Sequence, residues 1–278
     1  MRYITREMTR AALAIMQQFH VRQLQLHRDF DIDFVINTGR RNIVMSAAQE
    51  ESFARVLNEK FSDVLVDGRT GKADIYIGEL DRELECKLTT PNATTGAISF
   101  NTDYETLLRK GSLDYLYVIV SADFEKFCVL HFVDLTVTDF RPPAAGARGK
   151  SAMIKCKGMQ KCEALWGDVE TQNDRAVERA NSVLAAKMLR LNQECDDARG
   201  HLITIEAALE RDVDFVTGEP LRSRRRCGMR KIRDRLKARP EWLGKKYKQD
   251  VIRIDKKIDE VQRRPPQFSF ILRDLNMG

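Results

Sequence analysis

The stretch ADIYIGELDRELECK, residues 73–87, decides how the first half of this chain folds. Its two halves, ADIYI and ELECK, alternate apolar and polar residues with the period of two that is typical of β-strands. Four charged side chains nevertheless lie within these strands: Asp74, Glu83, Glu85 and Lys87. Charged groups are costly to bury unless they are paired, hydrated or bound to a metal ion. The hairpin therefore combines a structural pattern with an unexplained group of charges.

The register of the hairpin decides whether its charged residues meet. Alternation places Glu85 and Lys87 on one face of their strand, and Asp74 and Tyr76 on one face of the other. A four-residue loop, residues 79–82, pairs Tyr76 with Glu85 and Asp74 with Lys87. A five-residue loop would put Asp74 and Glu85 on opposite faces. We predict the four-residue loop, which gathers the charges on one face.

A helix upstream of the hairpin adds another carboxylate. Ser46 and Gln49 have the spacing of a capping box, which predicts a helix over residues 46–61. Its apolar side chains recur at a spacing of four: Phe53, Leu57 and Phe61. At 100° per residue, Glu50 lies within about 20° of the last two of these, whereas Glu51 points away. Glu50 is therefore expected to face the sheet.

The pattern over residues 1–165 predicts one mixed α/β domain. Helices are expected over residues 3–27 and 103–110, the second closed by Gly111, and a turn over residues 37–42. Strands are expected over residues 29–36, 63–67, 73–78, 83–88, 113–120 and 126–133. These elements predict a mixed sheet flanked by helices.

Residues 166–278 predict a helical region instead. Apolar residues recur there at spacings of three and four: Val177, Ala180, Leu184, Met188, Leu191, Cys195, Ala198, Leu202, Ile205 and Leu209. A second seam runs from Tyr247 to Val261 and ends before Pro265 and Pro266. Two long helices with such stripes predict an antiparallel coiled-coil hairpin. The segment RSRRRCGMRKIRDRLKAR, residues 222–239, would then give the hairpin a basic tip.

Composition limits the possible functions. The chain has 278 residues, of which 43% are hydrophobic and 32% charged, and it has no apolar run long enough for a membrane helix. Its start lacks the apolar segment of a secretion signal, so we expect a cytoplasmic protein. The six cysteines are scattered without a CxxC pair and are expected to be reduced thiols. The net charge of +6 arises from residues 213–278, which favours a polyanionic partner.

The charged residues of the hairpin and helix suit divalent metal chemistry. Mg²⁺ prefers oxygen ligands, keeps several waters, and usually takes one or two protein carboxylates. Such an ion can acidify a bound water and neutralise charge on a phosphoryl oxygen, while a nearby lysine can orient the water or stabilise the anion. The alternative explanation is a solvated strand face with cross-strand ion pairs.

Glu50 on a helix, Asp74 in ADIYI and Glu85-x-Lys87 in ELECK resemble the PD-(D/E)xK nuclease superfamily, which includes most type II restriction endonucleases. The resemblance covers roughly residues 46–132, and Ala73 stands where the family name has proline. It implies a restriction-endonuclease-like fold, with Asp74 and Glu85 as ligands of one or two Mg²⁺ ions. It also implies that Lys87 positions the water and that Glu50 serves a second metal or its water. Glu83 has no role in the pattern.

The resemblance implies a DNA-cleaving enzyme. We expect a type II restriction endonuclease that acts on double-stranded DNA, as a homodimer because two strands are usually cut by two sites. Candidate DNA-binding residues are Asn101 and Arg109 in the first domain, and in the basic segment Arg222, Arg224, Arg225, Arg226, Arg230 and Lys231. Two alternatives stay open: a structure-specific repair, recombination or phage nuclease, and a non-catalytic nucleic-acid-binding coiled-coil protein.

Overall fold

The computed structural model describes the chain except for residues 1, 35–36, 68, 70–71, 144–148 and 276–278. The chain divides into two compact units. Unit 1 comprises Met1–Glu170 together with Phe268–Gly278, and unit 2 comprises Thr171–Gln267. The predicted division at residue 165 assigned the whole C-terminal part to the helical region. The last residues instead return to unit 1, because Phe270 and Leu272 pack against the core of its sheet.

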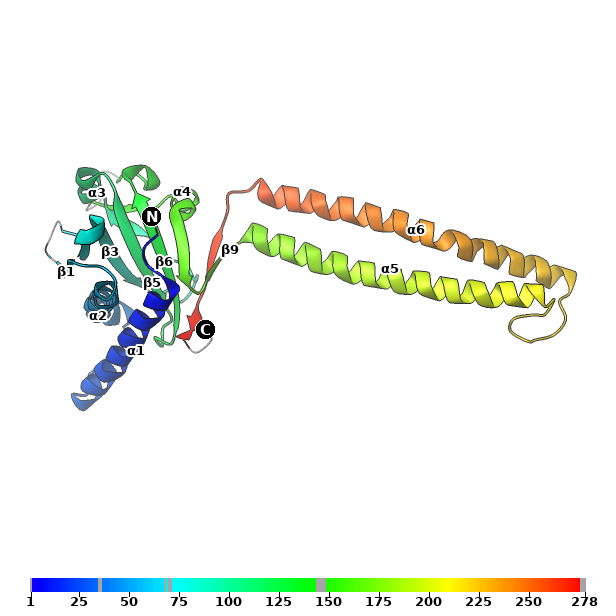
Figure 1. Ribbon diagram of the computed structural model, residues 1–278, viewed down its shortest axis with the longest axis horizontal. Helices are drawn as coiled ribbons and strands as arrows, with labels where there is room; N and C mark the ends of the chain where they lie inside the picture. Colours follow the sequence, from blue (N-terminus) through cyan, green and yellow to red (C-terminus); the bar gives the residue numbers. More distant parts are fainter. Residues whose placement is uncertain (1, 35–36, 68, 70–71, 144–148, 276–278) are drawn as a thin grey trace. The chain divides into compact units, whose positions relative to one another are not determined.

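Unit 1 is a mixed α/β structure (Figure 1). Its helices of seven or more residues are α1 (Arg6–Asp29), α2 (Thr38–Asn58) and α3 (Tyr104–Lys110). Shorter helical turns are η1 (Gly78–Leu80), η2 (Val137–Asp139), α4 (Lys155–Gly158) and η3 (Met159–Lys161). Its strands are β1 (Val64–Val66), β2 (Ile75–Ile77), β3 (Arg82–Thr89), β4 (Asn101–Asp103), β5 (Leu113–Val120), β6 (Lys126–Leu135), β7 (Lys150–Ala152), β8 (Cys162–Trp166), β9 (Asp168–Thr171), β10 (Phe268–Ile271) and β11 (Arg273–Asp274).

Within the described residues, seven of these strands form one sheet, in the order β1-β2-β3-β5-β6-β11 with β8 also paired to β6. β3 and β5 run parallel, whereas the other neighbours in this sheet are antiparallel. An antiparallel ladder joins β4 to β7, and β9 pairs with β10 in a second two-stranded sheet. The predicted mixed sheet is therefore confirmed.

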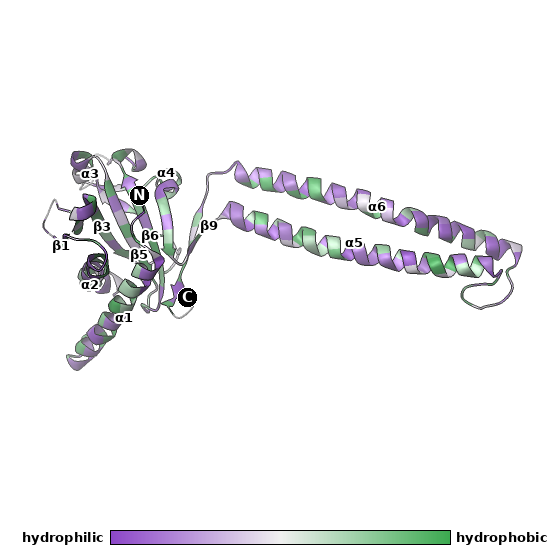
Figure 2. Cartoon of the chain, in the orientation of Figure 1, coloured by the Kyte–Doolittle hydropathy of each residue, from purple (hydrophilic) through white to green (hydrophobic). Residues whose placement is uncertain are grey.

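Two apolar clusters cover the two faces of the sheet. On one face, α1 and α2 pack against side chains such as Ile75, Leu84 and Val118. On the other face, aromatic side chains of the central strands, including Tyr115 and Tyr117, pack with residues from α3 and the segments around it. Figure 2 shows the hydrophobic colour of the central strands β5 and β6, whose side chains supply both clusters.

The first two helices differ from the sequence prediction at their ends. Residues 30–34 form no strand; Ile32 N–H donates to the carbonyl of His27 (2.8 Å), and Asp31 has a left-handed backbone that closes α1. The last two residues of that predicted strand, 35–36, lie outside the described part. α2 begins eight residues before the predicted capping box, because the side chain of Asn37 accepts a hydrogen bond from Arg40 N–H. Ser46 lies inside the helix.

Unit 2 is a pair of long antiparallel helices that contact each other along their length: α5 (Gln172–Glu210) and α6 (Ser223–Gln262). Cys195, Ala198 and Ile205 of the predicted seam are buried, although Met188 is 40% exposed. The predicted helical hairpin is confirmed, but its tip is different. The connecting residues are 211–222, and the basic segment forms the first part of α6.

All six cysteines have free thiols. None of the helices in the described ranges is both long enough and apolar enough to span a membrane.

Candidate active site

The β2–β3 hairpin brings its charged residues together in a register that differs from the predicted one. Tyr76 lies opposite Glu83 rather than Glu85, and Ile77 lies opposite Arg82. The cause is the turn: η1 and Asp81, whose backbone is left-handed, close the hairpin one residue earlier than expected. The resulting slip along β3 is two residues, an even number, so each side chain keeps its face.

Asp74 lies just before β2 and is bonded directly to β3. Its Oδ2 accepts a hydrogen bond of 2.7 Å from the backbone N–H of Cys86, the residue between Glu85 and Lys87. Burial raises the pKa of Asp74 and the charge of Glu85 raises it further, whereas Lys87 and the hydrogen bond from Cys86 lower it. The net shift is upward, so the Asp74 carboxylate is short of compensating positive charge.

Glu85 and Lys87 form an ion pair on one face of β3. The distance from Lys87 Nζ to Glu85 Oε1 is 2.5 Å. Burial lowers the pKa of Lys87, but the charge of Glu85 and the hydrogen bond to it outweigh burial and raise the pKa overall. In the parallel ladder, Glu85 lies opposite Tyr115 and Lys87 opposite Tyr117. The lysine is therefore held as a cation beside the two acids.

Glu50 joins this group from α2. Burial raises its pKa to about 7, the charges of Asp74 and Glu85 raise it as well, and Lys87 lowers it. These interactions show that the Glu50 carboxylate shares the electrostatic environment of the hairpin residues. Glu51 is exposed, in agreement with the helical-face prediction. The structure thus brings the four predicted residues into one neighbourhood.

The donor set suits a hard divalent cation. Three carboxylates contribute oxygen atoms, and the pKa values of Asp74 and Glu50 are both raised, so added positive charge would relieve their repulsion. In the part of the chain that the structure describes, no group of three or more His, Cys, Asp or Glu side chains is placed so that it could hold a metal ion. Mg²⁺ usually takes only one or two protein carboxylates and keeps several waters, so Asp74 and Glu85 could hold this ion without a third protein ligand.

A second lysine at this site was not predicted from the sequence. Lys110, in the last turn of α3, forms an ion pair of 2.8 Å with Glu83, and its side chain is only 16% exposed. Its charge also lowers the pKa of Asp74, so it lies within electrostatic range of the acids. Sequence analysis selected its neighbour Arg109, because nothing in the local pattern shows which residue of this turn faces the sheet.

The two candidate DNA-binding residues of unit 1 lie on β4 and α3. Asn101 of β4 is exposed, and its carbonyl accepts a hydrogen bond of 2.8 Å from the hydroxyl of Tyr117, the residue opposite Lys87. Arg109 is exposed on α3 and donates to the hydroxyl of Thr106 (3.2 Å). Asn101 is therefore tied to β5, the neighbour of the strand that carries Glu85 and Lys87, whereas Arg109 is held within its own helix.

The basic candidates of unit 2 fall into two groups. Arg225 pairs with Asp214 and Arg226 with Asp212, so acids of the connecting segment already neutralise these two. No ion pair is made within the described residues by the other four, which are all exposed: Arg222, Arg224, Arg230 and Lys231. These four offer unneutralised positive charge on α6 and at its start.

Comparison of the chain with models of protein families, with curated proteins and with solved structures gives no match. The geometry of the site and the sequence pattern are therefore the grounds for a functional proposal.

Proposed function

We propose that this chain is a Mg²⁺-dependent endonuclease that hydrolyses phosphodiester bonds in double-stranded DNA. One observation carries the proposal: Asp74 is hydrogen-bonded to the backbone between Glu85 and Lys87, and Glu50 interacts electrostatically with all three. Acids and a lysine in this arrangement are what metal-assisted hydrolysis of a phosphodiester requires. The mixed sheet with flanking helices is compatible with a restriction-endonuclease-like fold.

Asp74 and Glu85 would hold the cation, and Glu50 would bind a second ion or a water in its shell. When bound, Mg²⁺ supplies an acidified water and neutralises negative charge on the phosphate. The raised pKa values of Asp74 and Glu50 are consistent with a site that is electrostatically incomplete without positive charge.

Lys87 would act through its ammonium group. It is held 2.5 Å from Glu85, so its three N–H donors are fixed beside the acids that would bind the metal. From there Lys87 Nζ can orient the attacking water and donate a hydrogen bond to the phosphoryl oxygen on which charge develops. We assign it no proton abstraction, because its pKa is raised and it stays protonated near neutral pH.

Lys110 and Glu83 would support this centre. Glu83 holds the Lys110 ammonium on the same side of β3 as Glu85, and nearby positive charge favours the approach of a DNA phosphate. This gives a role to Glu83, for which the sequence pattern offered none.

Sequence-specific cleavage of the type II restriction class is the biological role we propose, carried out by a homodimer that presents one site to each strand. The exposed cations of α6 would contact the phosphate backbone, which positions DNA without reading its sequence. Base recognition would come from side chains near the catalytic site, of which Asn101 is the candidate tied to β5.

Digestion of a long plasmid with Mg²⁺ tests the proposal, with Asp74→Ala and Lys87→Ala run in parallel. Discrete bands that depend on Mg²⁺ and disappear in both variants would support a restriction endonuclease. A smear, or cutting only at junctions, would point to a structure-specific nuclease. Binding of DNA without cleavage by the wild-type protein under all metal conditions would overturn the enzyme proposal.

A further inference from the structure

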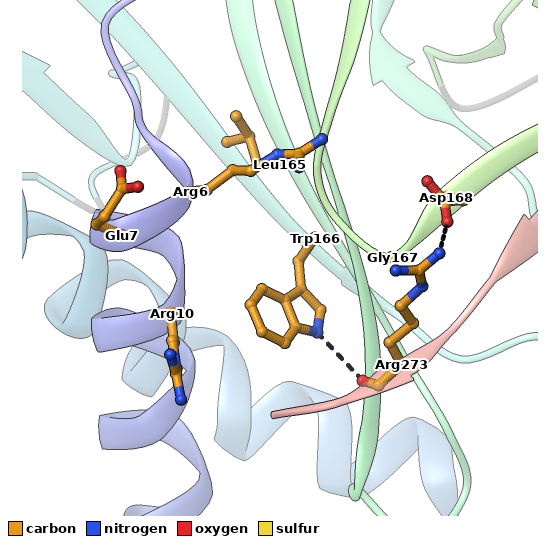
Figure 3. Close-up of a pocket in the computed structure, with 8 residues that line it drawn as sticks. All are labelled: Arg6, Glu7, Arg10, Leu165, Trp166, Gly167, Asp168 and Arg273. Carbon is orange, nitrogen blue, oxygen red and sulfur yellow. Dashed lines mark hydrogen bonds and ion pairs between the residues drawn. The ribbon is translucent and has the colours of Figure 1, made fainter. Parts of the chain in front are cut away.

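A pocket of about 270 Å³ lies in unit 1, between the start of α1, the end of β8 and strand β11 (Figure 3). The acidic residues of the candidate active site take no part in its lining. Its chemistry is different as well: Arg6, Arg10 and Arg273 contribute guanidinium groups, and Trp166 contributes an indole. The pocket is therefore basic and aromatic, whereas the candidate active site is mainly acidic.

The Trp166 indole is fixed in position without stacking on another ring. Its Nε1–H donates to the carbonyl of Arg273 (3.2 Å), which ties β8 to β11. The next residue, Gly167, has a left-handed backbone, and a Cβ there would collide with the carbonyl oxygen of Ile271, so the chain after β8 approaches the end of β10 closely. In the described structure no aromatic side chain pairs with Trp166. Its ring is half-buried at the wall of the pocket.

Two arginines of α1 line the pocket without forming an ion pair in the described part of the chain. Arg6 and Arg10 are one helical turn apart and exposed, and neither forms an ion pair within the described ranges. The carboxylate of Glu7 accepts hydrogen bonds at the start of α1, from its own backbone and from the hydroxyl of Thr5, and these lower its pKa; the charge of Arg6 lowers it to a smaller extent.

Across the pocket, the other carboxylate is also already engaged. Asp168 is paired with Arg273, as the dashed line in Figure 3 marks. Arg6 and Arg10 thus form no ion pair with either carboxylate, and they line the pocket together with an indole that is held in place.

We infer that this pocket binds a nucleotide through its base and its phosphate. An indole stacks readily on a base, and arginine guanidinium groups bind phosphate through paired, charge-assisted hydrogen bonds. A volume of about 270 Å³ accommodates one nucleotide and excludes a duplex. The ligand is either a free mononucleotide or one unpaired nucleotide of a strand, since both present the same base and phosphate.

Tryptophan fluorescence can report on this site alone. The chain has two tryptophans, and the second, Trp242, lies on α6, so Trp242→Phe leaves Trp166 as the single emitter. This full-length protein is titrated in EDTA, which prevents metal-dependent cleavage, with 2′-deoxyadenosine 5′-monophosphate and with a short unpaired oligodeoxynucleotide. Deoxyadenosine and inorganic phosphate serve as probes of each half of the ligand.

Saturable quenching by the mononucleotide or the oligonucleotide supports the inference, and quenching by the oligonucleotide alone assigns the site to a strand. In the Arg6→Gln/Arg10→Gln double variant the affinity is expected to fall about tenfold or more, whereas Arg22→Gln, an exposed arginine elsewhere on α1, leaves it unchanged. The inference fails if neither probe quenches saturably, if deoxyadenosine binds as tightly as the mononucleotide, or if the double variant binds like the parent.

Discussion

Asp74 Oδ2 accepts a hydrogen bond of 2.7 Å from the backbone N–H of Cys86, so one candidate metal ligand is joined to the strand that carries the other. The bonded amide lies between Glu85 and Lys87, whose side chains point to the opposite face from Cys86. The Asp74 carboxylate is thus placed by the backbone of β3, whatever rotamers the neighbouring side chains adopt. This separates the structural role of Asp74 from its charge.

Asp74→Asn is expected to stop cleavage and preserve the fold. Asparagine keeps an oxygen that accepts the hydrogen bond from Cys86, but it lacks the charge that holds a divalent cation. Cleavage should fall by about 100-fold or more. Because the substitution also removes repulsion with Glu85 and Glu50, the free energy of unfolding should rise or stay within about 0.5 kcal/mol. Plasmid cleavage and thermal unfolding measure the two effects.

Thermal unfolding with and without Mg²⁺ supplies the control for this prediction. Saturating Mg²⁺ should raise the Tm of the wild-type protein, since a ligand that binds only the folded state stabilises it, and should leave the Tm of Asp74→Asn unchanged. Glu51→Gln removes an exposed acid next to Glu50 and should behave as wild type. An equal rise in all three proteins would exclude Asp74 as a ligand.

Lys110→Met is expected to slow cleavage without raising the Mg²⁺ requirement. The lysine is paired with Glu83 and lies in electrostatic range of Asp74, so its removal takes positive charge away from a cation site and favours metal binding. The variant should instead lose an interaction with the DNA phosphate. The rate of cleavage at saturating Mg²⁺ should therefore fall about tenfold.

The rate of cleavage measured over a range of Mg²⁺ concentrations tests this role for Lys110. Arg22→Gln changes an exposed arginine of α1 and should leave both the rate and the Mg²⁺ dependence unchanged. Full recovery of Lys110→Met at high Mg²⁺ would argue instead that Lys110 organises the metal ligands.

The sequence predicts strands well where apolar and polar side chains alternate. It predicts the register and the ends of an element less well, because these depend on turns and on contacts with residues distant in sequence. Residues 83–88 alternate, residues 113–120 are apolar or aromatic except for Asp114, and both segments form strands. The hairpin register was wrong by two residues because the left-handed Asp81 ends the turn early. The face of each charged residue survived this error, since the slip is even.

Tertiary contacts explain the other differences. The short strands β10 and β11 have too few residues to show a pattern, and they form because the sheet offers them partners. α2 begins at Thr38 because Asn37 caps it, whereas Ser46 has the sequence spacing of a cap but lies inside the helix. Lys110 was missed since its importance depends on Glu83, which is distant in sequence.

Acid should destabilise unit 1 through His131. This histidine of β6 is fully buried, and burial, followed by the charges of Arg2 and Arg82, lowers its pKa to about 4. In the unfolded chain the histidine has a pKa of about 6.5 and therefore binds the proton more tightly. This difference in pKa contributes fully to the free energy of unfolding above pH 6.5, and the contribution is lost as the pH falls toward 4. Between pH 7.5 and pH 5 the free energy of unfolding should therefore fall by about 2 kcal/mol.

Urea unfolding at these two pH values measures the contribution of His131. His131→Phe keeps an aromatic ring against Tyr3 and has no proton to bind. Between pH 7.5 and pH 5 the free energy of unfolding of this variant should fall by about 2 kcal/mol less than that of the wild-type protein. His201→Gln changes an exposed histidine of α5 and should retain the wild-type pH dependence. Identical pH dependence in all three proteins would refute the role of His131.

The ion pairs of α6 predict which arginines contribute to DNA affinity. Arg224 and Arg230 have no acidic partner within the described residues, whereas Arg225 and Arg226 are paired with Asp214 and Asp212. The unpaired cations release counterions when they meet phosphates, so Arg224→Gln/Arg230→Gln should reduce the slope of log K against log salt by about 2. Arg225→Gln/Arg226→Gln removes the same formal charge but should change the slope by less than about 1. Fluorescence anisotropy with a labelled duplex, over about 50 to 200 mM salt, measures the slope for both double variants. Equal slopes would show that the ion pairs with Asp212 and Asp214 do not keep Arg225 and Arg226 from binding DNA.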